Sequence, residues 1–288
     1  MSGFTSDWLA LREPLDAQSR NQPLLESVKR WRRHSGKLTI ADLGCGTGSN
    51  MRYLAPKLGG QQDWLLIDHD PQLLTAARSA LTVWAATVGA CLSRQADVLN
   101  IDHADFSCRV RLQALDLAGD LAHLPLSDVQ LVTASALLDL VSESWLIQLA
   151  AQCKQVGTAV LFVLTYDGKI RWSPADPGDE RIQQAVNRHQ RTDKGFGPAL
   201  GPQAAQVVDT VFSAQGYRLE MGCSDWTIGP DSVLLQQTLL ADWTQAATQI
   251  DSASQDRFAG WRQRREQHLI AMHSVLTVGH MDGFGWLP

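Results

Sequence analysis

Three glycines lie at alternate positions, Gly44, Gly46 and Gly48, directly after an apolar stretch that ends at Leu43. Glycine has no Cβ, so a loop of this kind turns tightly and lets a ligand approach the backbone closely. A helix that follows it offers free N–H groups and the positive end of its dipole. Ser49 stands where the dinucleotide-binding fingerprint G-x-G-x-x-G has its third glycine. The loop therefore predicts a cofactor site, and its spacing disfavours a nicotinamide dehydrogenase.

The G-x-G-x-G pattern resembles motif I of the class I (Rossmann-like) S-adenosylmethionine-dependent methyltransferases of the small-molecule type. About 20 residues after Gly48, Asp68 ends a second apolar stretch. The family has an acidic residue here that accepts both ribose hydroxyls, for which a carboxylate has two acceptor oxygens. Asp116 and Leu117 fall where the family places its adenine contacts, although Asp116 could equally cap a strand end. Residues 128–135 resemble the family's fourth motif, the strand that ends under the transferred methyl group.

The resemblance implies a role for each residue of this site. Gly44, Gly46 and Gly48 admit the methionine part of S-adenosylmethionine, and Asp42 orients the loop or contacts the cofactor's ammonium group. Arg20 is a candidate partner of the cofactor carboxylate because arginine suits bidentate pairing; the alternative is an ordinary surface arginine. The residues expected to bind the cofactor are Arg20, Asp42, Gly44, Cys45, Gly46, Gly48, Asn50, Asp68, His69, Asp116, Leu117 and Ser135.

The methyl acceptor is less clearly indicated by the sequence. Methyl transfer is an in-line displacement at an activated carbon, so the protein mainly aligns the reactants and excludes water. The segment Ser135-Ala-Leu-Leu-Asp-Leu140 lacks the Asn/Asp-Pro-Pro-Tyr/Phe signature of methyltransferases that act on bases or glutamine, which argues against a DNA base. Many small-molecule members have a histidine where this chain has Asp139. That carboxylate would accept a proton or bind a cationic substrate, or else would only favour a helix start.

Further candidates follow the predicted strand ends, where open parallel sheets bind ligands. His273 and His280 flank the last predicted strand, but a lone histidine gives no reason to nominate a general base. No sequence cluster of metal-ligating residues calls for a metal. We expect Asp139 and Tyr166 in the catalytic site, and Trp172, Asp225 and Trp226 at the substrate.

Short apolar stretches alternate with helical ones, which favours a mostly parallel α/β sheet with helices on both faces. The resemblance covers roughly residues 38–166 and 203–225 and the last strand, and implies a three-layer Rossmann-like sandwich of seven strands, the last antiparallel. We expect a helical segment at 1–36 and a methyltransferase domain at 37–288. In that domain an irregular excursion at about 167–201 and helices within 226–272 would form a substrate cover. The strands are expected near residues 38–43, 64–67, 109–115, 128–134, 158–165, 217–221 and 274–278.

Composition narrows the class of protein. Of the 288 residues, 44% are hydrophobic and 19% are charged, which excludes a disordered chain. The net charge of -5 gives no overall attraction to nucleic acid or to an anionic membrane. The five cysteines suggest neither a disulfide framework nor a metal knuckle, and the N-terminus lacks the apolar region of a signal peptide. We therefore expect a cytoplasmic enzyme with a small-molecule acceptor and no membrane or nucleic-acid partner.

Two other functions are compatible with the sequence. The basic cluster Lys29–His34 contains Trp31 and could contact phosphate and stack a base, as in an RNA methyltransferase. The alternative is a solvated helix end, where cations are favoured by the dipole. A non-catalytic sensor or scaffold that only binds S-adenosylmethionine is the third hypothesis. The leading one is methyl transfer (EC 2.1.1.-) from S-adenosylmethionine to an oxygen, nitrogen or carbon of a small metabolite.

The chain has ten tryptophans against three tyrosines and seven phenylalanines. Trp64 and Trp84 fall in the cofactor-binding half, where core packing accounts for them. Four other tryptophans fall in or beside the expected substrate cover. They either face an aromatic, apolar or cationic acceptor, or they fill the core of the cover. These are Trp172, Trp226, Trp243 and Trp261.

Overall fold

The computed structural model describes residues 4–32 and 36–288, and this part of the chain forms one sheet of ten strands. The strand order is β3-β4-β5-β2-β1-β6-β7-β10-β8, with β9 beside β10. The bounds are β1 (Lys37–Leu43), β2 (Gly60–Asp68), β3 (Cys91–Gln95), β4 (Val98–Asp102), β5 (Phe106–Ala114), β6 (Leu131–Ser135), β7 (Ala159–Ser173), β8 (Arg218–Cys223), β9 (Trp226–Ile228) and β10 (Val275–Trp286).

The five central strands β5, β2, β1, β6 and β7 are parallel, and β10 lies antiparallel between β7 and β8. This confirms the expected mostly parallel Rossmann-like sheet with an antiparallel last strand. The structure adds three strands to the seven expected. The hairpin β3–β4 extends the sheet beyond β5. Strand β9 pairs with residues 276–278, near the start of β10.

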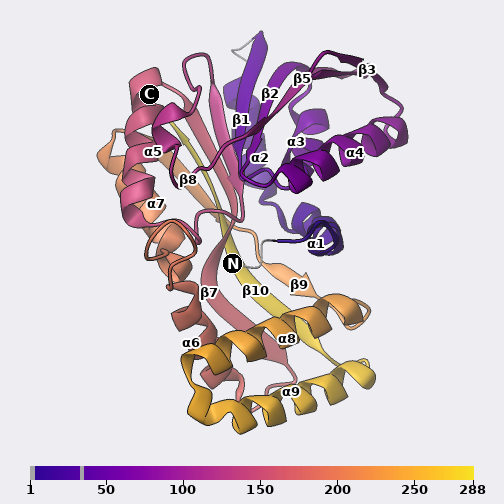
Figure 1. Ribbon diagram of the computed structural model, residues 1–288, viewed down its shortest axis with the longest axis vertical. Coiled ribbons are helices and arrows are strands. Elements are labelled where there is room, and N and C mark those ends of the chain that lie inside the picture. Colours follow the sequence, from indigo (N-terminus) through magenta and orange to yellow (C-terminus); the bar gives the residue numbers. More distant parts are fainter. Residues whose placement is uncertain (1–3, 33–35) are drawn as a thin grey trace.

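Side chains alternate across the sheet and create two apolar cores. Ile40 of β1 packs in a core with residues of α2 (Gln22–Arg32), α3 (Ser49–Leu58) and α4 (Pro71–Thr87). Its neighbour Ala41 packs in the other core, with residues of α5 (Glu143–Val156) and α7 (Ala204–Ala214). Figure 1 shows the two helical layers on opposite faces of the sheet. Short 3₁₀ turns lie at Leu121–His123, Gly201–Gln203 and Ser252–Ser254.

Helix α1 (Ser6–Ser19) lies at the carboxyl edge of the parallel strands, between the sheet and the lower helices of Figure 1. Thr5 caps it by accepting a hydrogen bond from the backbone N–H of Trp8. Of its 14 residues, all within the described part of the chain, Arg12 alone is buried. Trp8, Leu11 and Leu15 of this helix are partly buried and pack against the core, and polar contacts of Arg12 and Glu13 add to this packing.

The strands β7 and β10 continue past the edge of the sheet as a two-stranded ribbon. Helices α6 (Asp179–Gln190), α8 (Val233–Ile250) and α9 (Gln255–Ile270) pack around this ribbon at the bottom of Figure 1; we call ribbon and helices the cap. The expectation of an irregular excursion at 167–201 was therefore wrong for residues 167–173 and 179–190. Ile170 and Trp172 are buried and alternate with exposed Lys169 and Arg171, a strand pattern interrupted in the sequence by glycine and proline.

The last strand also runs further than residues 274–278, because glycines continue it where neighbouring side chains come close. A Cβ placed on Gly279 would lie 2.1 Å from Asp167 Oδ1, and one on Gly283 would lie 2.7 Å from Met221 Sδ. Two register shifts against β7 accompany these glycines. A glycine-rich strand of this kind looks like a loop in the sequence.

Tryptophans fill the interior of the cap. The ring of Trp172 makes edge contacts with Trp243 and Trp261, with ring centroids 5.5 and 5.3 Å away. Trp261 is 1% exposed, and its Nε1 donates to Asp179 Oδ1 at 2.8 Å. Arg265 bonds to the same carboxylate and lies over the Trp172 ring. Trp172 therefore packs in the core of the cap and is 7% exposed.

Candidate cofactor and acceptor site

The glycine loop follows β1 and has the backbone that its sequence requires. Gly44, Gly46 and Gly48 have φ values of +64°, +53° and +77°, in the left-handed region that glycine adopts most readily. Gly46 N–H donates to Asp68 Oδ2 at 2.8 Å, and Cys45 N–H donates to the backbone oxygen of Ile67 at 2.9 Å. These bonds hold the loop against the end of β2.

Helix α3 begins at Ser49, and its N-cap residue Gly48 has no side chain that could cap the first N–H groups. The first N–H groups of such a helix are open to an anionic or polar group. Asn50, in its first turn, is 3% exposed and joins three neighbours: its Nδ2 donates to Asp42 Oδ1 and Thr133 Oγ1, and its Oδ1 accepts from Arg20. Asn50 thus links the N-terminal segment to the ends of β1 and β6.

Asp42 keeps one buried oxygen free. Its Oδ2 has no hydrogen-bond partner among the described residues, and the side chain is 1% exposed. Burial raises the pKa of Asp42 to about 7, although the bond from Asn50 and the charge of Arg20 act in the opposite direction. An unpaired buried acceptor is costly, so a donor or cation from a ligand would stabilise this carboxylate.

The expected ribose and adenine residues lie at the ends of β2 and β5. Asp68 is 5% exposed, and its Oδ1 accepts from Asp70 N–H at 3.0 Å, so each oxygen already holds one part of the loop. His69 is exposed, with Nδ1 3.3 Å from Asp68 Oδ1. Asp116 is exposed and accepts from Ala118 N–H, whereas Leu117 is buried with its carbonyl accepting from Trp145 Nε1.

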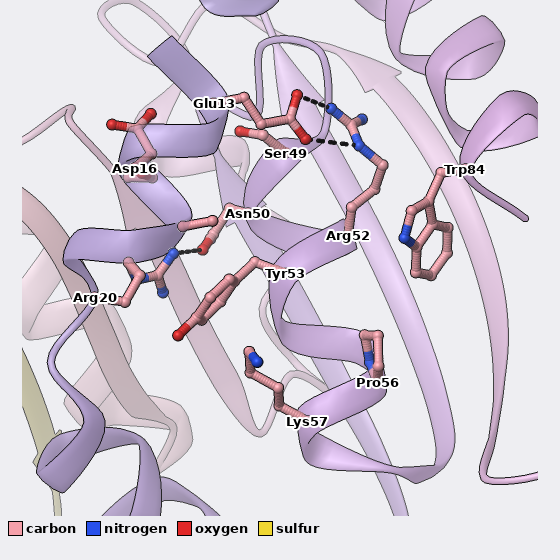
Figure 2. A pocket seen from close by; sticks show the side chains of 12 residues that line it. Glu13, Asp16, Arg20, Ser49, Asn50, Arg52, Tyr53, Pro56, Lys57 and Trp84 are labelled. Atoms are coloured by element: carbon pink, nitrogen blue, oxygen red, sulfur yellow. Dashed lines mark hydrogen bonds and ion pairs between the residues drawn. The ribbon is translucent and has the colours of Figure 1, made fainter. Parts of the chain in front are cut away.

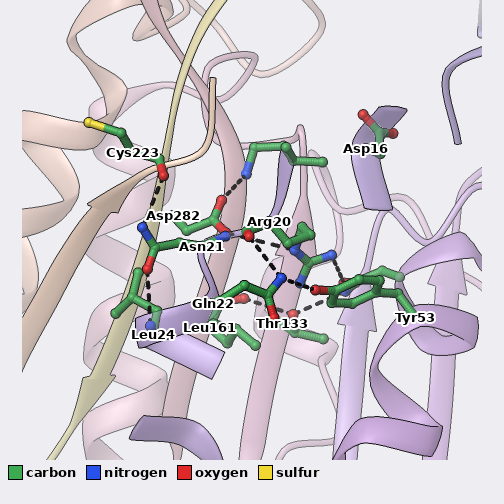
Figure 3. Close-up of polar contacts among 12 residues, drawn as sticks. Asp16, Arg20, Asn21, Gln22, Leu24, Tyr53, Thr133, Leu161, Cys223 and Asp282 are labelled. Carbon is green, nitrogen blue, oxygen red and sulfur yellow. Dashed lines mark hydrogen bonds and ion pairs between the residues drawn. The ribbon is translucent and has the colours of Figure 1, made fainter. Parts of the chain in front are cut away.

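Arg20 is 7% exposed and belongs to a buried polar network, shown in Figure 3. Its guanidinium donates to Asn50, lies 3.8 Å from Asp282 Oδ2, and stacks 4.5 Å over the Tyr53 ring. The alternative of an ordinary surface arginine is therefore wrong. Asp282 is a buried carboxylate that the sequence did not single out. No local signal marks it, since it stands alone between Met281 and Gly283.

A cavity of about 290 Å³ lies between α1 and α3 and extends to Ser135 at the end of β6 (Figure 2). Arg20, Asn50 and Asp16 line it as well. Helix α1 covers the glycine loop beside it, since a Cβ placed on Gly46 would lie 2.9 Å from Leu9 Cδ1. Glu13 of α1 is paired with Arg52 of α3 through two hydrogen bonds of 3.0 and 2.5 Å.

Asp139 lies just after β6 and is 7% exposed. Its Oδ1 is buried without a hydrogen-bond partner in the described part of the chain. Burial raises the pKa of Asp139 to about 6, while a backbone hydrogen bond from Tyr166 and the charges of Arg12 and Lys194 act in the opposite direction. Ala136, close before it, has φ +52°, a strained conformation for a residue other than glycine and one that clusters at functional sites.

Tyr166 is buried on β7, and its hydroxyl donates to Asn187 Oδ1 at 2.7 Å. Burial raises the pKa of Tyr166 well above its ordinary value. The phenol therefore stays protonated near neutral pH, with its proton already engaged. The structure thus gives Asp139, rather than Tyr166, the free acceptor atom.

Trp226 is 3% exposed and contacts Arg12, Asp16 and His280. The Arg12 guanidinium stands 4.9 Å from one ring centroid, the His280 ring lies 4.9 Å away, and Nε1 donates to Asp16 Oδ1 at 3.0 Å. Burial and the charge of Arg12 lower the pKa of His280 to about 3, so its imidazole is neutral. No role was expected for His280 from the sequence; its backbone N–H donates to Asp225 Oδ1 at 3.0 Å.

The basic cluster is used in packing where the structure describes it. Trp31 makes an edge contact with Phe284, and Arg32 donates to the backbone oxygens of Gly59 and Gln61. The Trp31 ring is therefore not a free stacking surface; Arg33 and His34 lie outside the described residues. Within residues 4–32 and 36–288, no group of three metal-ligating side chains gathers, and no helix is long and apolar enough to span a membrane.

Comparisons with known proteins agree with this geometry. Residues 40–118 match a family model described as a methyltransferase domain, whereas no curated protein matches the chain. The YcgJ protein from Bacillus subtilis is similar in structure, with a TM-score of 0.50, 14% identity, and coverage of 93% of this chain and 100% of that one. This likeness, at such low identity, shows the fold.

Two other solved structures match with lower scores. The cyclopropane synthase MmaA2 from Mycobacterium tuberculosis has a TM-score of 0.49, 10% identity, and coverage of 97% of this chain and 94% of that one. A putative sarcosine dimethylglycine methyltransferase from Galdieria sulphuraria has a TM-score of 0.44 and 11% identity, covering 91% and 84%. The matched residues 40–118 contain the glycine loop, Asp68 and Asp116, so this segment of the chain is similar to a class I S-adenosylmethionine-dependent methyltransferase domain.

Proposed function

We propose that the chain binds S-adenosylmethionine at the carboxyl ends of β1, β2, β5 and β6 and transfers its methyl group to an oxygen, nitrogen or carbon of a small molecule. The observation that carries the proposal is the glycine loop, held against the Asp68 carboxylate by the 2.8 Å bond from Gly46 N–H. The free oxygen of Asp42 also fits a cofactor with a charged amino group.

Each residue of the site has a specific task in this proposal. S-adenosylmethionine supplies, when bound, a methyl group activated by a sulfonium sulfur. Asp68 keeps lone pairs for the ribose hydroxyls; Asp42 accepts from the ammonium group through its free oxygen; Arg20 offers its remaining N–H groups to the carboxylate. The other residues that we place around the cofactor are Cys45, Asn50, His69, Asp116, Leu117 and Ser135.

We also propose that Asp139 takes up the proton that the methyl acceptor releases. An acceptor that begins with an O–H or N–H group has to lose a proton when it gains the methyl group. The free, buried oxygen of Asp139 can take it, and a pKa near 6 leaves this carboxylate mostly ionised at neutral pH. Trp226 and Asp225 form the adjoining wall. The cap and α1 together are the cover that excludes water.

The proposed cofactor binding is tested by substituting Asp68, the last residue of β2. We expect Asp68→Asn to weaken binding of S-adenosylhomocysteine by roughly 10- to 100-fold, the range for losing bonds to a charged acceptor. Titration calorimetry measures the affinity. Asp63→Asn is the matched control, because Asp63 lies on the same strand but pairs with Lys37 away from the site. Binding of NADH instead, with no effect of Asp68→Asn, would contradict the assignment.

The acceptor class is tested by incubating the enzyme with labelled S-adenosylmethionine and a metabolite extract. We expect label to enter one or a few small molecules, identified by mass. Label that enters only RNA, with binding that weakens steeply as salt rises, would favour an RNA substrate. Cofactor binding without any labelled product would instead favour a sensor or scaffold.

A further inference from the structure

The one buried side chain of α1 is a cation set against an aromatic ring. Arg12 is 8% exposed, and its guanidinium carbon lies 4.9 Å from the centroid of Trp226. Asp16, one turn further along α1, holds it through two hydrogen bonds of 2.9 and 3.2 Å. A guanidinium over an indole face is a favourable pairing, and more so where water is excluded. The acceptor side of the site thus has a place that suits a positive charge.

The groups that surround Arg12 from the other elements also suit a cation. Asp139 accepts a backbone hydrogen bond from Tyr166, whose ring lies 6.2 Å from the His280 ring that packs against Trp226. It keeps a buried oxygen without a partner in the described residues. His280, against Trp226, is neutral, since burial lowers its pKa to about 3. Lys194 also influences Asp139, but its ammonium bonds to Thr192 and approaches His189 on its own segment.

Arg12 belongs to an element that covers the cofactor site. Leu9, on the same helix, lies against Gly46 of the glycine loop, where the proposed cofactor has to approach the backbone. Any movement of α1 that uncovers this loop also withdraws Arg12 and Asp16 together, because both are carried by that helix. Trp226 and Asp139 stay behind, because they belong to β9 and to the loop after β6.

We propose that Trp226 and Asp139 form the binding site for a cationic group of the methyl acceptor, an alkylammonium or a guanidinium, and that Arg12 occupies this site when the acceptor is absent. The proposal rests on the proposed function, because it names the substrate class of the same site. A tethered occupant reduces the apparent affinity by the fraction of molecules in which the site is open. Removal of Arg12 therefore raises the affinity for a cation without any new contact.

The test uses choline as a cationic probe and 3,3-dimethyl-1-butanol as its uncharged counterpart of the same shape. Both are titrated into the full chain, with and without S-adenosylhomocysteine, and binding is followed by broadening of the methyl proton signals in NMR. We expect choline to bind and the alcohol not to bind. If Arg12 fills the site in nine of ten molecules, Arg12→Gln raises the affinity for choline about 10-fold.

Variants separate this site from general effects on the fold. Trp226→Leu and Asp139→Asn should each weaken choline binding at least several-fold, while Trp226→Phe, which keeps an aromatic face, retains part of it. Arg262→Gln is the matched control, because Arg262 is an exposed arginine of α9 paired with Glu266. Circular dichroism checks that each variant is folded.

The outcomes distinguish this inference from the proposed function. Equal binding of choline and the alcohol, or no gain from Arg12→Gln, would overturn the cationic site, as would absence of choline binding in every variant. If S-adenosylhomocysteine still binds with Asp68-dependent affinity in those cases, the proposed function stands and only the substrate class fails. Loss of S-adenosylhomocysteine binding itself would refute the function instead.

Discussion

The four buried aspartates of the described residues differ in whether both carboxylate oxygens have a hydrogen-bond partner. Asp68 and Asp282 each accept hydrogen bonds from two backbone N–H groups, one at each carboxylate oxygen. Asp42 and Asp139 instead each keep one oxygen without a partner among the described residues. Buried polar atoms are normally satisfied, so an unsatisfied one in a cleft points to a ligand or a proton. This contrast marks Asp42 and Asp139 as the buried carboxylates with an oxygen still available to a ligand or a proton, whereas Asp282 serves the fold and Asp68 both holds the loop and, in our proposal, binds the ribose.

The predicted pH dependence belongs to Asp139. If its carboxylate accepts a proton during methyl transfer, it has to be ionised, and burial raises its pKa from 3.8 to about 6. We therefore expect kcat/KM to rise as pH increases through about 6 and then to level off, because kcat/KM reports the ionisation of the ligand-free enzyme. The measurement is the pH profile of kcat/KM with an acceptor that has to lose a proton. The inflection should disappear in Asp139→Asn, and its persistence there would exclude Asp139 as the proton acceptor.

Three of these four aspartates could be identified from the sequence, and one could not. Asp42, Asp68 and Asp139 stand at strand ends within recognisable motifs, so their positions follow from the chain alone. Asp282 could not be found this way, because its partners Asn21 and Leu164 are 261 and 118 residues distant. The place of Arg12 over Trp226 is likewise a tertiary contact between an N-terminal helix and a late strand.

Asp282 connects several secondary-structure elements, so replacing it is expected to lower the stability of the fold. Its oxygens accept from Asn21 N–H, between α1 and α2, and from Leu164 N–H, where β7 has a φ of +54° beside a register shift. Asp282→Ala leaves two buried N–H groups and Arg20 without this partner. We expect a loss of about 3–5 kcal/mol in the free energy of unfolding, the range for a broken buried ion pair.

Urea unfolding followed by far-UV circular dichroism measures this loss. The comparison variant is Asp231→Ala, an exposed aspartate in the turn before α8. A loss of less than about 1 kcal/mol in Asp282→Ala, similar to an ordinary exposed site, would show that the network does not anchor the segment.

The elements themselves were predictable where periodicity was strong. The helices expected within residues 226–272 are present as α8 (Val233–Ile250) and α9 (Gln255–Ile270). The ends of β7 and β10 were not, because Gly168 and Pro174 interrupt one segment and repeated glycines dilute the other. The hairpin β3–β4 was missed because its outer strand is mostly exposed and shows little apolar alternation.

At the scale of the whole molecule, the Rossmann-like half and the cap share strands but have distinct centres of packing. The cap centre is the Trp172, Trp243 and Trp261 cluster, joined to Asp179 through Arg265. Of the tryptophans in or beside the expected cover, Trp172 packs inside the cap, whereas Trp226 lies against Arg12 of α1 and the His280 ring. A single sequence cannot decide between these roles, since both use the same residue type.

The cap centre is tested by Trp261→Ala. Removing a fully buried tryptophan should lower the free energy of unfolding by about 3–5 kcal/mol, through lost burial and the cavity left behind. Thermal unfolding measures the change. Ile270→Ala on the same helix is the control, because Ile270 is 81% exposed. If the two variants unfold alike, the aromatic cluster is not the structural centre of the cap.

The junction between the sheet and the cap has a mechanical consequence. Hinge motions concentrate in a few residues that absorb large backbone rotations. The pairing of β7 with β10 shifts register between Val278 and His280 and again between Met281 and Gly283, where the ribbon leaves the sheet. Gly168 of β7, beside the first shift, has a φ of +89°. Rotation of the cap against the sheet is therefore expected at these residues rather than within the regularly paired segments.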